Sequence, residues 1–307
     1  MLLLQQMLVL FIYMMLGFFL ARKSVLDERA GKTFSWMVVN VANPALIILP
    51  TISKETTLSP EQIWEALKLA VIMYVALIVI AKVITMFMRT SMEKNLYQMM
   101  MIFNNIAFMG FPIVAAAYGP DALLYSALFT LPFCLLIYTY GIVLITANGE
   151  KQEKLKLRSI FNIGVIAVIF ALAMLFIKPD MPEFVITATR GVSNLTGPLS
   201  MMVIGISLAG MKLKDVFCDK TLWLFSFVKL LVIPIIGTLI VIRLLDNDLL
   251  CHVCMVMLGT PVASMVVMLA QTYDADSELM SRGVALTTIL SVINMCFQNS
   301  PPIMSSG

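Results

Sequence analysis

Apolar runs long enough to cross a lipid bilayer recur along the whole of this 307-residue chain. A bilayer core about 30 Å thick needs about 20 apolar residues per helix. The runs are nearly free of charge, and none alternates apolar with polar residues as the strands of a membrane barrel do. We therefore predict an all-α membrane protein. The ten predicted spans are Leu2–Leu20, Thr33–Ile52, Ile63–Met88, Leu96–Tyr118, Ala122–Ala147, Ile160–Ile177, Gly191–Met211, Leu222–Ile242, Leu249–Tyr273 and Gly283–Phe297.

The charge content excludes a water-soluble domain. Charged residues make up 13% of the chain and hydrophobic residues 60%, whereas a soluble domain carries about 25% charge. An apolar excess of this size cannot be hidden inside one soluble core. The loops between spans, residues 148–159 among them, are no longer than about a dozen residues and are too short for a soluble catalytic or sensor domain. No basic patch persists outside short loops, so nucleic acid is not an expected partner.

The loop charges predict an orientation. Arg22 and Lys23 follow the first run rather than precede it, which is typical of a retained helix and not of a signal peptide. Fourteen Lys and Arg residues lie in odd-numbered loops, and four lie in even-numbered loops. Because positive loops stay in the cytoplasm, we expect a multi-pass protein of the cell (plasma or inner) membrane with both termini outside.

The two halves of the chain share proline motifs. The matched pairs are Asn40-Val-Ala-Asn-Pro44 with Asn194-Leu-Thr-Gly-Pro198, and Gly110-Phe-Pro112 with Gly259-Thr-Pro261. Each half holds five spans, and because five is odd the second copy starts on the opposite side of the membrane. This predicts a 5 + 5 inverted repeat with a first unit at 1–147, a cytoplasmic linker at 148–159 and a second unit at 160–307.

The paired Gly-x-Pro motifs predict broken helices in spans four and nine. A single intramembrane proline is commonly a kink. Two matched pairs favour interrupted helices, whose unpaired backbone groups are tolerated only where they line a polar cavity or a site. The neighbouring polar residues fit a cavity: Asn104 and Asn105 precede the first motif, and Thr260 and Ser264 flank the second proline.

The chain resembles the auxin efflux carrier family of membrane transporters, which includes plant auxin carriers and bacterial malonate and malate permeases. The stretches that carry the resemblance are Asn40–Pro44, Asn104-Asn-Ile-Ala-Phe-Met-Gly-Phe-Pro112, Gly197-Pro-Leu-Ser-Met-Met-Val-Ile-Gly205 and Gly259-Thr-Pro-Val-Ala263. The resemblance implies spans four and nine that cross at their prolines, a scaffold of spans one, two, six and seven, and a mobile unit of the other six. It also implies elevator-like transport of organic anions and a possible homodimer.

The distribution of charge favours an anionic cargo. All 18 acidic residues fall in loops or near span ends, whereas carriers of metal ions or protons keep carboxylates in their path. Helix N-termini at a break add partial positive charge. We therefore predict a small organic anion, and the resemblance suggests a mono- or dicarboxylate such as malonate or malate. Lys82 and Lys229 lie inside predicted spans, where they either snorkel to the interface or act in charge neutralisation or coupling.

The predicted substrate site combines the two breaks with a facing wall. The break residues are Asn104, Asn105, Gly110, Pro112, Gly259, Thr260, Pro261 and Ser264, and the wall residues are Asn40, Asn43 and Asn194. The alternative for each asparagine is that its amide joins helices to one another, as polar residues in membranes commonly do.

Other functions have weaker support. Cys251-His-Val-Cys254 resembles a metal motif, but zinc needs four ligands and His252 is the single histidine. We expect no metal, no cofactor and no enzymatic activity, since no hydrolase or phosphate-binding motif is present. An anion channel is the main alternative to a transporter, and a membrane receptor or structural subunit is a weaker one.

Overall fold

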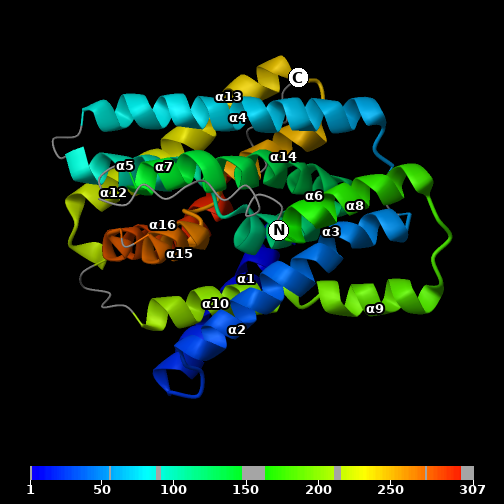
Figure 1. Ribbon diagram of the computed structural model, residues 1–307, viewed down its shortest axis with the longest axis horizontal. Coiled ribbons are helices and arrows are strands. Elements are labelled where there is room, and N and C mark those ends of the chain that lie inside the picture. Colours follow the sequence, from blue (N-terminus) through cyan, green and yellow to red (C-terminus); the bar gives the residue numbers. More distant parts are fainter. Residues whose placement is uncertain are drawn as a thin grey trace.

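The computed structural model describes residues 2–54, 57–87, 91–146, 163–210, 216–273 and 275–298, and these ranges are helical with no strand (Figure 1). The α-helices are α1 Leu2–Arg22, α2 Glu28–Met37, α3 Asn43–Ile52, α4 Pro60–Met86, α5 Ser91–Ile102, α6 Phe111–Leu136, α7 Ile142–Thr146, α8 Ile163–Ile177, α9 Glu183–Ser193, α10 Thr196–Ala209, α12 Lys220–Phe227, α13 Ile233–Leu244, α14 Asp248–Gly259, α15 Ser264–Thr272 and α16 Ser277–Gln298. Short π-helical segments are η1 Val38–Ala42, η2 Ile106–Gly110, η3 Ile137–Gly141 and η5 Val228–Val232. The predicted all-α class is confirmed, whereas the predicted linker at 148–159 lies outside the described residues.

Several helical segments have the length and composition of membrane spans. Among the residues that the structure describes, five segments are long and apolar enough to cross a bilayer: Glu28–Ile52, Pro60–Met86, Ile106–Thr146, Glu183–Ala209 and Lys220–Leu244. Shorter apolar helices occupy Leu8–Arg22, Ile163–Ile177 and Asp248–Gly259. Large hydrophobic side chains such as Ile72, Leu224 and Ile240 are exposed on the outer faces of these segments. This exposure is what a lipid-facing surface requires, and the chain is accordingly a multi-pass membrane protein.

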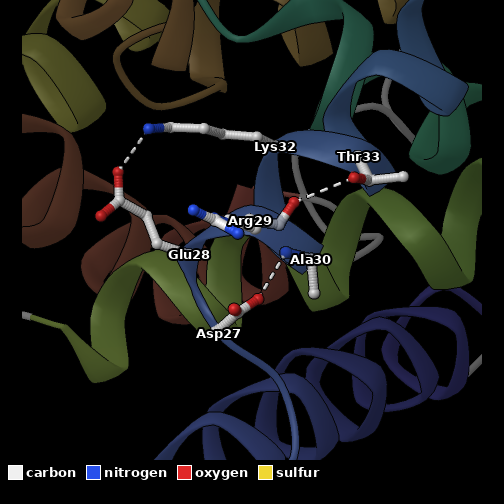
Figure 2. A network of polar contacts seen from close by, with 6 residues as sticks. All are labelled: Asp27, Glu28, Arg29, Ala30, Lys32 and Thr33. Carbon is white, nitrogen blue, oxygen red and sulfur yellow. Dashed lines mark hydrogen bonds and ion pairs between the residues drawn. The ribbon is translucent and has the colours of Figure 1, made fainter.

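A polar first turn starts the segment that carries α2, η1 and α3. The Asp27 carboxylate caps α2 by accepting a hydrogen bond from Ala30 N at 2.8 Å, as N-cap aspartates commonly do. Lys32 forms an ion pair with Glu28 at 2.7 Å, and the Thr33 hydroxyl donates to the Arg29 carbonyl (Figure 2). The charged groups at this end are exposed and bonded locally, which suits a helix end at the membrane surface.

A glycine reverses the chain inside α6. Gly119 has φ +80° and ψ −163°, a backbone conformation that residues with a β-carbon rarely adopt. Beyond this turn the chain runs back beside α5, as the packing of Gly141 against the side chains of Phe103 and Met99 shows. The 41-residue stretch Ile106–Thr146 therefore consists of an outward and a returning helix. The turn lies where the sequence predicts the loop between spans four and five.

Three of the π-helical segments share one relation to proline. In each of them, the residue that follows the segment donates its backbone N–H to the carbonyl five residues earlier. The next residue is a proline in all three cases: Pro44 after η1, Pro112 after η2 and Pro234 after η5. Proline has no N–H and its ring crowds the preceding turn, so a widened turn just before it accommodates the ring without ending the helix.

The helices pack in two groups. In one group, α1 lies along α10, α3 packs against α8 and α9, and α2 contacts α10. In the other group, α4 contacts α5 and α6, α14 contacts α13 and α6, and α16 contacts α15 and α12. Figure 1 shows α4 along one edge of the molecule, with α2 and α9 at the opposite edge. The contacts of α10 with η2 and of α1 with α6 and α16 join the two groups.

Glycines bring α1 and α10 into close backbone contact. A β-carbon at Gly205 would overlap the Met14 carbonyl oxygen and would lie 2.7 Å from Phe18 N. On the partner helix, a β-carbon at Gly17 would overlap the backbone of Met202. Small residues allow this kind of close approach between membrane helices. Both helices remain unbroken at the contact.

The helix break of the first half lies seven residues before the predicted one. The backbone leaves the helix at residues 103–105, between α5 and η2, and is helical through Pro112. The prediction of a break at Pro112 is therefore wrong, and the π-helical turn of η2 is the physical reason why the proline is tolerated. In the second half the break covers residues 260–263 and contains Pro261, as predicted.

Candidate functional site

The two helix breaks meet and pair with each other. Asn105 N donates to Pro261 O at 2.8 Å, and Ala263 N donates to Phe103 O at 3.0 Å. Asn104 and Val262 lie opposite one another between these bonds as an isolated antiparallel pair. The extended segments thus satisfy part of each other's backbone in the interior of the protein, which non-helical backbone within a membrane requires. We refer to residues 103–105 and 260–263 as the crossing.

The first break closes with a tight turn. Asn105 has φ −80° and ψ 62°, close to an inverse γ-turn, and Ile106 N donates to Asn104 O at 2.9 Å. Asn105 O then accepts hydrogen bonds from Met109 N and Gly110 N, at 3.2 and 3.1 Å. The bond from Gly110 spans five residues and begins the π-helical turn. A new helix start therefore follows directly after the crossing.

Both polar atoms of the Asn104 side-chain amide form hydrogen bonds. Its Nδ2 donates to Met257 O at 2.7 Å, and its Oδ1 accepts a hydrogen bond from Lys229 Nζ. Lys229 Nζ also donates to Met101 O at 2.8 Å, and the lysine is 2% exposed. Lys229 therefore lies against the crossing and not at the membrane surface.

The amide of Asn105 is differently placed. Asn105 is buried, and its Nδ2 has no hydrogen-bond partner within the described part of the chain. A buried amide donor without a partner costs about 1–3 kcal/mol. Such a donor at the start of a helix is suited to an anionic group, because the first N–H groups of that helix also lack intrahelical acceptors.

The crossing has a positive and a negative side. The helices η2–α6 and α15 begin at it, and α5 and α14 end at it. Each helix N-terminus carries about +0.5 of a charge and each C-terminus about −0.5. The lysine is bonded to the side where helices end, through Met101 O. The side where helices begin includes Asn105 and, at the start of α15, the half-buried Ser264.

The predicted glycine and threonine residues pack the two breaks together. A β-carbon at Gly110 would lie 2.9 Å from the Met257 methyl carbon and 3.5 Å from the Thr260 methyl group. The Thr260 hydroxyl donates to Met257 O at 2.9 Å. Gly259 and Pro112 are both buried in the same region. These residues set how closely α14 approaches η2.

The predicted wall asparagines differ from one another. Asn43 is buried and its Nδ2 contacts the Ala107 carbonyl at 3.4 Å, so it links α3 to η2 across the boundary between the helix groups. Asn40 donates to Trp36 O one turn earlier in its own helix. Asn194 is exposed and follows α9 as its C-terminal cap residue. The structure therefore brings Asn43 to the crossing region and gives no such contact to Asn40 or Asn194.

Lys82 lies away from the crossing. Its side chain is exposed in the last turns of α4, with Nζ 5.6 Å from the centre of the Tyr140 ring. This position near a helix end is compatible with a stem that reaches the interface. Lys82 and Lys229, which the sequence treats alike, are thus in different environments.

Two polar residues of α16 are absent from the predicted site: Thr287 contacts the crossing, and Ser291 contacts η2, which follows it. Thr287 Oγ1 accepts a hydrogen bond from Val262 N at 3.2 Å, and Ser291 Oγ contacts Met109 Sδ at 3.6 Å. The available sequence signal is their spacing of four residues, which places both on one face of a helix.

The cysteine motif does not form a metal site in the described ranges. His252 Nδ1 is 2.6 Å from the Asp248 carbonyl oxygen, and its ring lies against Tyr118. Cys251 and Cys254 are buried. No group of three or more His, Cys, Asp or Glu residues that could hold a metal ion occurs among the described residues.

An apolar cavity of about 360 Å³ lies beside the crossing, between α4, α5, α12 and η5. Its lining is mostly apolar and includes Tyr97, Met101 and Phe225, with Thr85 and Thr221 as its uncharged polar residues. A small organic anion needs polar donors, so this cavity does not fit the predicted cargo.

These features define a helical multi-pass membrane protein whose polar centre is a pair of interrupted helices. The sequence profile of the membrane transport protein family matches residues 2–298, and the chain belongs to this family. The predicted relation to the auxin efflux carriers is thereby confirmed. The family assignment indicates a transporter rather than an enzyme.

Archaeal relatives of similar length extend over nearly all of the chain. An uncharacterized transporter of Methanocaldococcus jannaschii is 25% identical over 304 residues, which cover 93% of this chain and 94% of the relative. An uncharacterized transporter of Methanothermobacter thermautotrophicus is 24% identical over 292 residues, which cover 92% and 93%.

Proposed function

We propose that this protein is a secondary transporter that moves a small organic anion, such as malonate or malate, across the cell membrane by an elevator-like alternating-access mechanism. The observation that carries the proposal is the buried, unpartnered Nδ2 donor of Asn105 at a helix start. The carboxylate of the cargo accepts a hydrogen bond from this amide and is favoured by the partial positive charge of the helix start. Charge-assisted bonds of this kind favour an anion over a cation.

The packing of the helices supports a moving unit and a fixed unit. The group around α1, α3, α8 and α10 corresponds to the predicted scaffold, and the crossing belongs to the other group. The contact between Asn43 and Ala107 O joins the two at 3.4 Å, a weak bond that a sliding motion can break. The same proposal includes a 5 + 5 inverted repeat of spans, with both termini outside the cell. It also includes a homodimer formed through the scaffold.

A binding and uptake experiment tests the cargo. The purified protein is heated with a series of mono- and dicarboxylates, because a ligand that binds the folded state raises its melting temperature as its concentration exceeds its dissociation constant. Proteoliposomes then test whether the stabilising acid is taken up saturably and exchanges in counterflow. Uptake of a cation with no response to any organic acid would contradict the proposal.

The variant Asn105→Ala tests the site. Its affinity for the stabilising acid is expected to fall about tenfold to a hundredfold, since a hydrogen bond to a charged group contributes about 1.5–3 kcal/mol. The matched control is Asn40→Ala, which removes an amide bonded within its own helix and should leave the affinity unchanged. Equal affinity of Asn105→Ala and the parent protein would refute the assignment of Asn105.

An anion channel is the alternative that the polar crossing leaves open. A channel would give an ohmic current in a planar bilayer with no counterflow. A carrier gives saturable uptake with counterflow, which an open ohmic pore does not give.

A further inference from the structure

Lys229 is a buried lysine that contacts oxygen atoms but, among the described residues, no carboxylate. It is 2% exposed and lies in the π-helical segment η5. The two ion pairs in the described part of the chain are Lys32 with Glu28 and Lys54 with Asp180, and neither involves it. A charge inside a membrane protein without an opposite charge is costly. The crossing must therefore supply the compensation by other means.

The compensation comes from the ends of two helices. Lys229 Nζ donates directly to Met101 O, in the last turn of α5, at 2.8 Å. It also donates to Asn104 Oδ1, and the Nδ2 of the same amide donates to Met257 O in the last turn of α14. Asn104 thus links the lysine to the C-terminal end of α14 through its own hydrogen bond to Met257 O. One ammonium group is connected to the C-terminal ends of both helices.

The charges balance in sign and in size. Two helix C-terminal ends together carry about one negative charge, and one ammonium group carries one positive charge. Carbonyl and amide oxygens are also the ligands that a hard metal cation prefers. The two oxygen atoms that Lys229 Nζ contacts, Met101 O and Asn104 Oδ1, are of this kind.

We infer that Lys229 is a built-in cation that neutralises the C-terminal side of the crossing, so that the site needs no bound metal ion. The N-terminal side, with the Asn105 amide, stays available for the cargo. This inference rests on the proposed function for the identity of the cargo, and on the geometry alone for the role of the lysine. Cargo binding then takes place without co-bound sodium or potassium.

Substitutions of Lys229 test the charge in the absence of any cargo. Lys229→Met keeps the length of the stem and removes the charge, and Lys229→Gln keeps a donor without the charge. Both are expected to lower the melting temperature of the ligand-free protein by about 5 °C or more. Lys82→Met is the matched control and should leave it unchanged. A melting temperature of Lys229→Gln equal to that of the parent protein would overturn the inference, because a neutral donor would then be enough.

A truncated variant allows the missing cation to be returned. Lys229→Ala removes three carbon atoms and the ammonium group, which together correspond to n-propylammonium. Added n-propylammonium is expected to restore most of the lost melting temperature, and 1-propanol is not. Equal restoration by both compounds would show that filled volume matters instead of charge, and would overturn the inference.

The unmodified protein provides a test that does not depend on the folding of any variant. Its melting temperature, and its affinity for a stabilising acid, are measured in sodium, potassium, lithium and choline chloride at equal ionic strength. Identical values support a built-in cation, and a specific rise with one metal ion overturns it. The melting temperatures measured without acid test the role of Lys229 independently of the proposed cargo. If no organic acid binds, the proposed function fails. The comparison of salts in the absence of acid then still decides whether Lys229 replaces a metal ion.

Discussion

Two pairs of helical elements come into close contact in this protein, and they achieve it in opposite ways. At Gly17 and Gly205, α1 and α10 approach through missing side chains while both helices stay intact. At the crossing, the helices themselves are interrupted and the backbone pairs across the gap. The first contact leaves no backbone polar group in need of a partner. The second requires Asn104, Lys229 and further polar groups, and it leaves the Asn105 Nδ2 donor without a partner in the described part of the chain.

The two contacts differ in what they contribute: the glycine contact contributes to the stability of the fold, and the crossing also provides polar groups. The glycine contact is close packing between backbones and offers no polar group to a cargo. The crossing exchanges helical hydrogen bonds for bonds that depend on side chains from several elements. Substitutions should therefore act on folding at the first contact and on both folding and transport at the second.

The largest effect is expected from Gly205→Leu. Because the β-carbon would overlap the backbone carbonyl of Met14, the two helices have to separate, and we expect a loss on the order of 4 kcal/mol in the free energy of unfolding. The measurement is the yield and melting temperature after size-exclusion chromatography. Gly197→Ala serves as control, since its β-carbon would have Leu10 at 3.8 Å. A Gly205→Leu protein as stable as the parent would show that this contact is not tight.

A smaller loss is expected from Thr287→Val. The change keeps the shape of the side chain but removes the acceptor of Val262 N, which leaves a buried N–H group unbonded at a cost of about 1–3 kcal/mol. Thr288→Val is the matched control, because Thr288 Oγ1 is buried without a hydrogen-bond partner in the described part of the chain. Equal melting temperatures for the two variants would contradict the role of Thr287.

Gly110→Ala should cost less, about 1 kcal/mol, because the atom it would meet is the flexible Met257 methyl group at 2.9 Å. Shortening that neighbour by Met257→Leu in the double variant is expected to recover much of the loss, which a double-mutant cycle measures. No neighbouring side chain can provide such a rescue at Gly205, where the overlap is with backbone. Failure of the rescue at Gly110 would remove this distinction between the two contacts.

The smallest effect concerns an ion pair outside both contacts. The Lys54 ammonium group, which is bonded to Asp180, lowers the pKa of that carboxyl group. A lowered folded-state pKa contributes stability above the unfolded value of about 3.9, and this contribution disappears as the pH falls through the folded-state pKa. Asp180→Asn should therefore lower the melting temperature slightly at pH 7 and not at all well below pH 4. A difference that persists in acid would contradict the pairing.

The sequence predicts the helical class and the existence of two interruptions, because apolar length and proline are local signals. It misplaces the first break, since the effect of Pro112 depends on the π-helical turn before it. It also treats Asn104 and Asn105 alike. The structure separates them, because both polar atoms of the Asn104 amide are hydrogen-bonded, whereas Asn105 Nδ2 has no partner in the described part of the chain. The arrangement of ten spans as an inverted repeat remains a prediction.

Lys82 and Lys229 show why the site could not be fully predicted. Both lie in apolar runs several residues from a basic loop, so their sequence environments are alike. Their difference arises from partners far away in the chain, since Lys229 contacts Met101 and Asn104, 128 and 125 positions earlier. Contacts at such separations depend on how the spans pack, and one sequence alone does not define that.

The same separation has a consequence for how the protein is made. Inserting a lysine at the centre of a membrane helix costs about 2.5–3.5 kcal/mol, and the stretch that contains Lys229 leaves the ribosome after the acceptors at Met101 and Asn104. Because chains are synthesised from the N-terminus, the residues whose oxygen atoms receive the ammonium group are made before the lysine itself. We therefore expect the earlier half of the polypeptide to provide the hydrogen-bond acceptors for Lys229 when the later half inserts.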